Sequence, residues 1–264
     1  MRFAKVNGTR WNVAYSKFYA QVMMAFFLLW MCSAGPVPAG EDANNEIYSH
    51  LLSSFVSGGV VDYRGFWVEE GKLDQYLLRL EWTDTSALTS NDQLAFYINA
   101  YNAWTIKLVL GSYPGIKSIK DVGTIFSSPW TKKICRIDGK ILSLDDIEDG
   151  IIRLRFRDPR IHFAINCASK GCPPLASEPY RGASLDAQLD AAARNFINDP
   201  SRYLLDGNQL FVSRIFKWYA FDFKDGVLNF MLKYAQGDLL QNLKANGDKI
   251  EIHYLEYDWS LNGK

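Results

Sequence analysis

The sequence has few of the residues and motifs that usually reveal a function. Its 264 residues include four cysteines, too few for a disulfide scaffold at this length. Lysine plus arginine number 29 and aspartate plus glutamate also number 29, so no net positive charge points to nucleic acid as a partner. The patterns GxGxxG, HExxH and GxSxG are absent, as is GxxxxGK followed by Ser or Thr. Their absence excludes the common nucleotide-binding and hydrolase signatures, and we expect no cofactor.

Internal repeats and low-complexity linkers are also missing. Hydrophobic residues make up 48% of the chain and charged residues 22%, which excludes a disordered, collagenous or coiled-coil protein. The length is sufficient for one large domain with a sizeable core. Aromatic residues reach 14%, with eight tryptophans, and indicate tight aromatic packing.

The first forty residues have the pattern of a secretory signal peptide. Residues 1–17 contain four basic residues and no acidic one, and residues 18–40 are uncharged and largely apolar. Small residues predict cleavage after Ala39 or Ala34. An uncleaved anchor is the alternative, and only then would the protein contact a membrane, although Pro36 and Pro38 shorten the helical part. We therefore expect a signal peptide over residues 1–39, a single domain over residues 40–264, and export to the periplasm or cell envelope.

The expected domain mixes helices and hairpins without a regular βαβ alternation, which predicts an α+β fold with a mainly antiparallel sheet. The segment 92–110 is apolar on nearly all sides and is typical of a buried central helix. Asp-Gly pairs at 138–139 and 206–207 predict two hairpins. Ser143, with Asp146 three residues later, resembles a capping box. Further helices are expected at 43–57, 66–80, 144–156, 185–198 and 225–236, and strands at 60–66, 160–166 and 249–255.

Chemically active side chains are densest in residues 160–175, RIHFAINCASKGCPPL, which we expect to run from a buried strand into a loop. One hypothesis is a thiol nucleophile at Cys167, with His162 or His253 as the base. Five extended residues span about 16 Å, so His162 reaches Cys167 only if the chain turns sharply at Asn166. Asn166, Ser169 and Lys170 would then be candidates for substrate binding.

Two alternatives remain open for the same residues. His162, Cys167 and Cys172 are soft metal ligands, but their spacing of five and the lack of a fourth ligand do not fit a zinc site, so we expect no metal. A disulfide between Cys167 and Cys172 would instead close the loop and suit an exported protein. In that case His162 would be a buried structural residue. His253, between Ile252 and Tyr254, could simply point outward from an edge strand.

The central helix carries a second group of polar residues. Asn99 and Asn102 are three positions apart and share a face. Asn99 could orient a catalytic histidine and Asn102 could bind a substrate amide. Alternatively, both tie the helix to neighbouring loop backbone, because most side-chain hydrogen bonds in proteins go to backbone or water.

Five segments together resemble the domain of unknown function 547 family. The resemblance extends over residues 45–262 and rests on LAFYINAYNAWTI (94–106), DGKILSLDDIEDGIIR (138–153), DPRIHFAINCASKGCPPL (158–175), IFKWYAFDF (215–223) and YDWSLN (257–262). The family has no assigned activity, and its bacterial members are commonly exported. Its pattern carries over onto His162, Cys167, Ser169, Cys172 and Pro173, onto Asn99, Tyr101 and Asn102, and onto Tyr257, Asp258, Trp259 and Asn262.

The family pattern does not include His253, which favours His162 as the base. The leading hypothesis is an uncharacterised exported thiol-dependent hydrolase or acyl transferase acting on peptide or amide bonds of a small-molecule or peptide substrate. The alternative is a non-catalytic binding module of the cell envelope with a structural Cys167–Cys172 disulfide.

Overall fold

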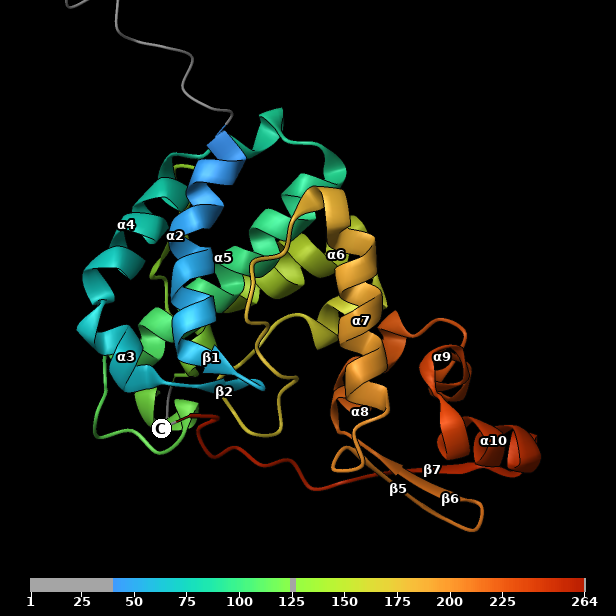
Figure 1. Ribbon diagram of the computed structural model, residues 1–264. Coiled ribbons are helices and arrows are strands. Elements are labelled where there is room, and N and C mark those ends of the chain that lie inside the picture. Colours follow the sequence, from blue (N-terminus) through green and yellow to red (C-terminus); the bar gives the residue numbers. More distant parts are fainter. Residues whose placement is uncertain (1–39, 124–126, 264) are drawn as a thin grey trace, which may run out of the picture. The chain divides into compact units, whose positions relative to one another are not determined.

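The computed structural model describes residues 40–123 and 127–263. The predicted signal peptide and its cleavage sites lie outside these residues. Residues 44–264 form one compact unit, which is the domain considered below. Helices and short strands alternate along it, which confirms the expected α+β class (Figure 1).

The larger helices surround a long central one. The central helix α5 (Ser90–Leu110) is buried along most of its length, as its apolar sequence predicts. The Thr89 side chain caps its first turn by accepting a hydrogen bond from the backbone N–H of Asp92. The other helices of eight or more residues are α2 (Gly40–Phe55), α4 (Glu70–Trp82), α7 (Leu185–Ile197), α9 (Val227–Tyr234) and α10 (Gly237–Asn246), and the short ones are α3 (Tyr63–Val68), α6 (Leu154–Phe156) and α8 (Ile215–Trp218).

Strands in the described residues are short and form three small sheets. β1 (Val56–Ser57) pairs with β2 (Val60–Val61), and β3 (Cys135–Ile137) pairs with β4 (Lys140–Leu142), both antiparallel. The third sheet has the order β5 (Tyr203–Asp206), β6 (Gln209–Val212), β7 (Glu251–Tyr254). β6 is antiparallel to β5 and parallel to β7, so pairing is mainly antiparallel, as predicted.

Both predicted hairpins form, but the second one turns one residue later than expected. In the first, Ile137 pairs with Lys140, and Asp138 and Gly139 have φ angles of 51° and 68°. These values fit a two-residue turn that needs left-handed backbone at both positions. In the second, Asp206 is still paired with Gln209, so the turn consists of Gly207 and Asn208.

The predicted strand 160–166 is wrong. Pro159–Phe163 forms the 3₁₀ helix η5, and the chain then enters an irregular loop. Asp158 begins this helix by accepting a hydrogen bond from the backbone N–H of Arg160, and Pro159 occupies a first-turn position that needs no N–H. The predicted helix 66–80 and the predicted strand 60–66 also differ from the structure. Two helices, α3 and α4, form in place of one, with a break at Glu69, and only Val60–Val61 of the strand is extended.

The domain contains two hydrophobic clusters. The larger is built mainly by α2 to α5, and the smaller by α7 to α10 with the third sheet. After β7, the last residues run back to the larger cluster, where the backbone N–H of Lys170 donates to Ser260 and that of Gly171 to Asp258. This return places the C-terminal segment beside the loop that follows η5 (Figure 1).

Within residues 40–123 and 127–263, no helix is long and apolar enough to cross a membrane.

Candidate functional site

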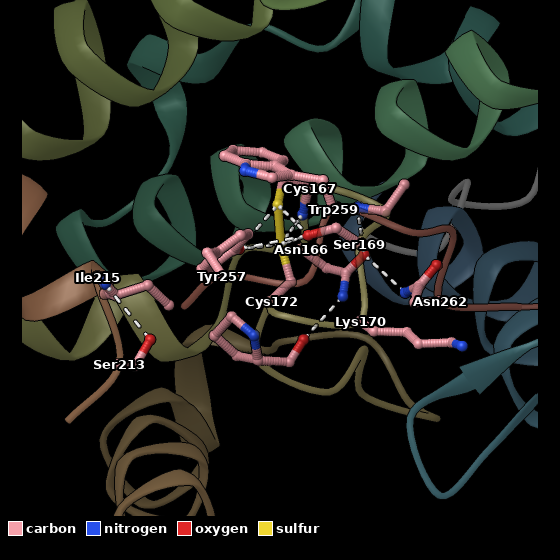
Figure 2. The surroundings of a disulfide bond; sticks show 12 residues. Asn166, Cys167, Ser169, Lys170, Cys172, Ser213, Ile215, Tyr257, Trp259 and Asn262 are labelled. Atoms are coloured by element: carbon pink, nitrogen blue, oxygen red, sulfur yellow. Dashed lines mark hydrogen bonds between the residues drawn. A yellow bond between two sulfur atoms is a disulfide. The ribbon is translucent and has the colours of Figure 1, made fainter. Parts of the chain in front are cut away.

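The loop after η5 is closed by a disulfide bond between Cys167 and Cys172 (Figure 2). Polar groups surround the two sulfur atoms. The Tyr257 hydroxyl lies 3.4 Å from the sulfur of Cys167 and 3.3 Å from that of Cys172, and the Ser169 hydroxyl lies 3.2 Å from the sulfur of Cys167. The backbone N–H of Cys167 also points at the Cys172 sulfur, 2.9 Å away. The disulfide is therefore held in one position by the C-terminal segment as well as by its own loop.

Asn166 organises the backbone of the same loop. Its side-chain NH2 donates to the carbonyl of Pro173 at 2.7 Å, and its side-chain oxygen accepts from the N–H of Ala168 at 2.9 Å and from the Asn262 amide at 3.1 Å. Ala168 has a φ of 62°, the left-handed conformation that an alanine rarely adopts. The hydrogen bond that its N–H donates to Asn166 holds it there. Asn166, which is 4% exposed, is thus a structural residue of the loop and not a surface group free to bind substrate.

A cavity of about 410 Å³ opens beside the disulfide. It lies where the two hydrophobic clusters meet, and six aromatic side chains and a histidine make up much of its wall. Its volume is in the range typical of small-molecule sites. The lining residues are Tyr101, Trp130, Asp145, Glu148, His162, Ile165, Cys167, Cys172, Pro173, Ile215, Trp218, Tyr219, Tyr257 and Trp259.

Three aromatic contacts in the cavity wall have steeply inclined rings. Trp259 packs against Tyr257, with ring centroids 4.6 Å apart and planes inclined by 52°, and against Trp130 at 5.7 Å and 62°. Trp218 lies 4.7 Å from Tyr257 at 59°. Rings inclined in this way present both faces and edges to a ligand, unlike a flat stacking platform.

Glu148 is a buried carboxyl group in the wall of the cavity. It lies on the π-helix η4 (Asp146–Arg153), which the predicted Ser143–Asp146 capping box begins. Such wide helical turns are frequent at functional sites. Burial raises the pKa of Glu148 to about 7, although hydrogen bonds from Tyr219 and Tyr101 act in the opposite direction. Its Oε1 atom is buried without a hydrogen-bond partner among the described residues.

His162 lines the same cavity and is buried, with 2% of its surface exposed. Its Nε2 lies 2.7 Å from Oδ2 of Asp222, and its ring stacks on Tyr219 at 3.9 Å. Burial lowers the pKa of His162, whereas the contact with His162 lowers the pKa of Asp222, which Arg153 also binds at 2.6 Å. We therefore assign a neutral imidazole whose Nε2–H donates to an ionised Asp222. This tautomer leaves Nδ1 as an acceptor, and Nδ1 is buried with no partner among residues 40–123 and 127–263.

The structure brings together only part of the predicted thiol site. Cys167 and His162 line the same cavity, but the sulfur of Cys167 is bonded to Cys172 and is not a thiol in this state. His253 lies on β7, stacks on Phe211 at 4.9 Å and does not line the cavity. The disulfide that the sequence left as an alternative is therefore the arrangement found.

Asn99 and Asn102 bind the central helix to loop backbone, which is the second of the two roles that the sequence allows for them. Asn99 exchanges two hydrogen bonds with the backbone of Tyr180, at 2.8 and 2.9 Å. Asn102 donates to the carbonyl of Ala164 at 3.0 Å and accepts from the N–H of Asn166 at 2.8 Å. Neither lines the cavity, so neither is placed to orient His162 or to touch a ligand there.

The remaining predicted residues also lie outside the cavity wall. Ser169 is buried behind the disulfide, where its hydroxyl contacts that of Tyr257 at 3.3 Å, and Lys170 is exposed. In the part of the chain that the structure describes, no three His, Cys, Asp or Glu side chains are arranged to hold a metal ion.

Sequence reasoning missed Glu148, Asp222 and Tyr219. The signal for Glu148 was present, because it follows Ile147 and lies on the same helical face as Ile152, where an acidic residue is out of place in an amphipathic pattern. Asp222 and Tyr219 lie in the segment 215–223, about 60 residues from His162. No local sequence pattern indicates that Asp222 and Tyr219 will contact His162 in the folded chain.

Together the fold and the cavity define an α+β domain with a disulfide-braced, aromatic-walled pocket. Residues 85–197 match the family described as "Protein of unknown function, DUF547", so this part of the chain is similar to that family. The matched segment contains Glu148, His162 and both cysteines of the disulfide. The C-terminal part of the cavity wall, from Ile215 onward, lies outside it. No curated protein and no solved structure matches the chain.

Proposed function

We propose that this protein is an exported, non-catalytic binding module that takes a small organic molecule into the aromatic cavity. The observation that carries the proposal is the cavity itself, about 410 Å³ and walled by Trp130, Trp218, Tyr219, Tyr257 and Trp259. Aromatic side chains supply large contact areas at little conformational cost. The disulfide serves as a fixed part of this wall, and its presence agrees with an oxidising compartment such as the periplasm or cell envelope.

Binding is tested on the purified protein with four probes: 2-phenylethylammonium, 2-phenylethanol, 3-phenylpropanoate and methyl glucoside. Tryptophan fluorescence and the shift in thermal midpoint report binding. We expect at least one probe to bind, and Trp218→Ala to weaken it by about tenfold, in the range for losing an aromatic contact in a pocket. Trp82→Ala is the matched control, because Trp82 is 78% exposed on α4 and outside the cavity. If no probe binds, or if both variants behave alike, the proposal is wrong.

A second candidate is the thiol-dependent hydrolase or acyl transferase, because Cys167 and His162 share one cavity. It requires a reduced state in which Cys167 becomes a thiolate and His162 takes its proton. After mild reduction, Cys167 should then react with iodoacetamide faster than Cys135, whose pKa burial raises to about 12. His162→Gln should slow the reaction at Cys167 but not at Cys135. Labelling of Cys167 only after denaturation would rule this candidate out.

A further inference from the structure

The cavity is acidic as well as aromatic. Two carboxyl groups line it, those of Asp145 and Glu148, and no lysine or arginine among the described residues does so. Burial raises the pKa of Asp145, and neighbouring Asp149 and Asp146 raise it further. The surroundings therefore disfavour negative charge on both groups, and a positively charged ligand would offset that effect.

Two cationic side chains that contact wall residues, Arg153 on Tyr219 and Lys120 on Trp259, are already engaged. Arg153 binds Asp222 at 2.6 Å and Asp149 at 2.5 Å. Lys120 lies over the ring of Trp259, 3.7 Å from its centroid. Neither belongs to the cavity wall, and although Arg153 attracts the ionised form of Glu148, burial outweighs this attraction and the pKa of Glu148 stays raised.

Two buried acceptor atoms of residues that line the cavity lack donors. They are Oε1 of Glu148 and Nδ1 of His162, and neither has a hydrogen-bond partner among residues 40–123 and 127–263. Tyr219 interacts with both side chains, since its ring stacks on His162 and its hydroxyl lowers the pKa of Glu148. A buried acceptor without a donor is costly, and each such group in a folded protein calls for an explanation.

One class of ligand suits the acidic groups, the two acceptor atoms and the aromatic rings of the cavity together. An ammonium group carries positive charge, donates up to three N–H bonds and is attracted to aromatic faces. A neutral alcohol supplies a donor but no charge. A carboxylate would add negative charge beside Asp145 and Glu148, and a quaternary ammonium has no N–H to donate.

We infer that the cavity binds a protonated organic amine, with the ammonium group between Glu148 and His162 and an apolar body against Trp218 and Trp259. This inference rests on the proposed function, because it names the ligand class of the same cavity. The ammonium donates N–H bonds to Oε1 of Glu148 and to Nδ1 of His162. The Asp222–His162 contact fixes the imidazole tautomer that accepts such a bond, so Asp222 is a positioning residue.

The test compares probes that share a 2-phenylethyl body and differ in the head group, on the folded, oxidised protein. We expect 2-phenylethylammonium to bind at least about tenfold more tightly than 2-phenylethanol, the usual value of one hydrogen bond to a charged group. N,N,N-trimethyl-2-phenylethylammonium keeps the charge but has no N–H, and it should also bind at least about tenfold more weakly than the primary ammonium. 3-Phenylpropanoate should bind most weakly.

Substitutions of Glu148 and His162 test which side chains bind the ammonium group. Glu148→Gln keeps the shape and removes the negative charge, and it should weaken 2-phenylethylammonium by about tenfold or more while leaving 2-phenylethanol within about twofold. His162→Phe keeps the ring stack on Tyr219 but removes the acceptor, and it should weaken the primary ammonium more than the trimethylated one. Glu46→Gln is the control, since Glu46 is exposed on α2. Circular dichroism checks that each variant is folded.

The outcomes separate this inference from the proposed function. If 2-phenylethanol or 3-phenylpropanoate binds best and Trp218→Ala abolishes that binding, the cavity is a ligand site but the amine inference is wrong. If the trimethylated probe equals the primary ammonium, the acceptor argument is wrong. If no probe binds in a way that Trp218→Ala weakens, both proposals fail together.

Discussion

Glu148→Gln should make the protein more stable at alkaline pH and leave it nearly unchanged at acid pH. Burial raises the pKa of Glu148 from 4.5 to about 7, so the folded protein keeps a proton that the unfolded chain has released. Stability therefore falls as the pH rises from about 4.5 to about 7, and the full loss is present above that window. A shift of this size corresponds to about 3 kcal/mol. Glutamine never ionises, so the variant escapes this loss.

Burial sets the sign of this effect, because it outweighs the groups around Glu148 that favour the ionised form. The hydroxyl groups of Tyr219 and Tyr101 lower the pKa of its carboxyl group and Arg153 attracts the ionised form, whereas Asp149 repels it. Both tyrosines keep a partner in the variant, because a glutamine side chain still has one acceptor oxygen and can donate through its NH2.

Urea unfolding of the wild type and Glu148→Gln, followed by fluorescence between pH 4 and pH 8.5, measures the effect. The difference in free energy of unfolding should be within about 1 kcal/mol at pH 4 and should grow to about 3 kcal/mol in favour of the variant above pH 7.5. Using the difference cancels other titrating groups, such as His162, whose lowered pKa destabilises the fold at acid pH. Glu46→Gln, a substitution at an exposed site on α2, is the control variant. A pH-independent difference would refute the assignment of a buried, uncompensated carboxyl group.

Two further predictions concern the loop beside the cavity. Cys167→Ser and Cys172→Ser should each lower the free energy of unfolding by about 2 kcal/mol, because each opens the same small loop, and the double variant should lose no more than either single one. Denaturant unfolding with and without reductant checks this, and losses that persist under reductant would contradict it. Gly171→Ala would place a Cβ 2.8 Å from the ring of Tyr257. It should cost about 1–3 kcal/mol and weaken any ligand whose binding depends on Trp218, and unchanged stability and affinity would show that the ring moves freely.

Local structure could be read from the sequence wherever neighbouring residues decide it. The apolar run 92–110 predicted the central helix, and Asp138-Gly139 predicted a hairpin, because periodicity and turn chemistry act over a few residues. The same reasoning failed at 160–166. Apolar residues there suggested a buried strand, but no neighbouring strand pairs with them, and the Asp158–Pro159 start favours a 3₁₀ helix.

The sequence limited the site to a few alternatives without choosing between them. It marked Cys167 and Cys172 as either a reactive thiol with a neighbour or a disulfide, and both readings fit a spacing of five residues. It marked Asn99 and Asn102 as polar residues of a buried helix, which need partners, and the structure supplies those partners from loop backbone. The residues that give the cavity its charge were not singled out.

By itself, then, the sequence determined the α+β class, the central helix, the hairpins and the loop that carries the two cysteines, because each depends on local conformational preference. Only the tertiary structure decided which side chains share the cavity. Tyr257 and Trp259 reach the disulfide because the C-terminal segment pairs with residues 169–171, and Asp222 reaches His162 across 60 residues of chain. These tertiary contacts depend on how the two hydrophobic clusters pack against each other, and no spacing of residues along the sequence predicts that packing.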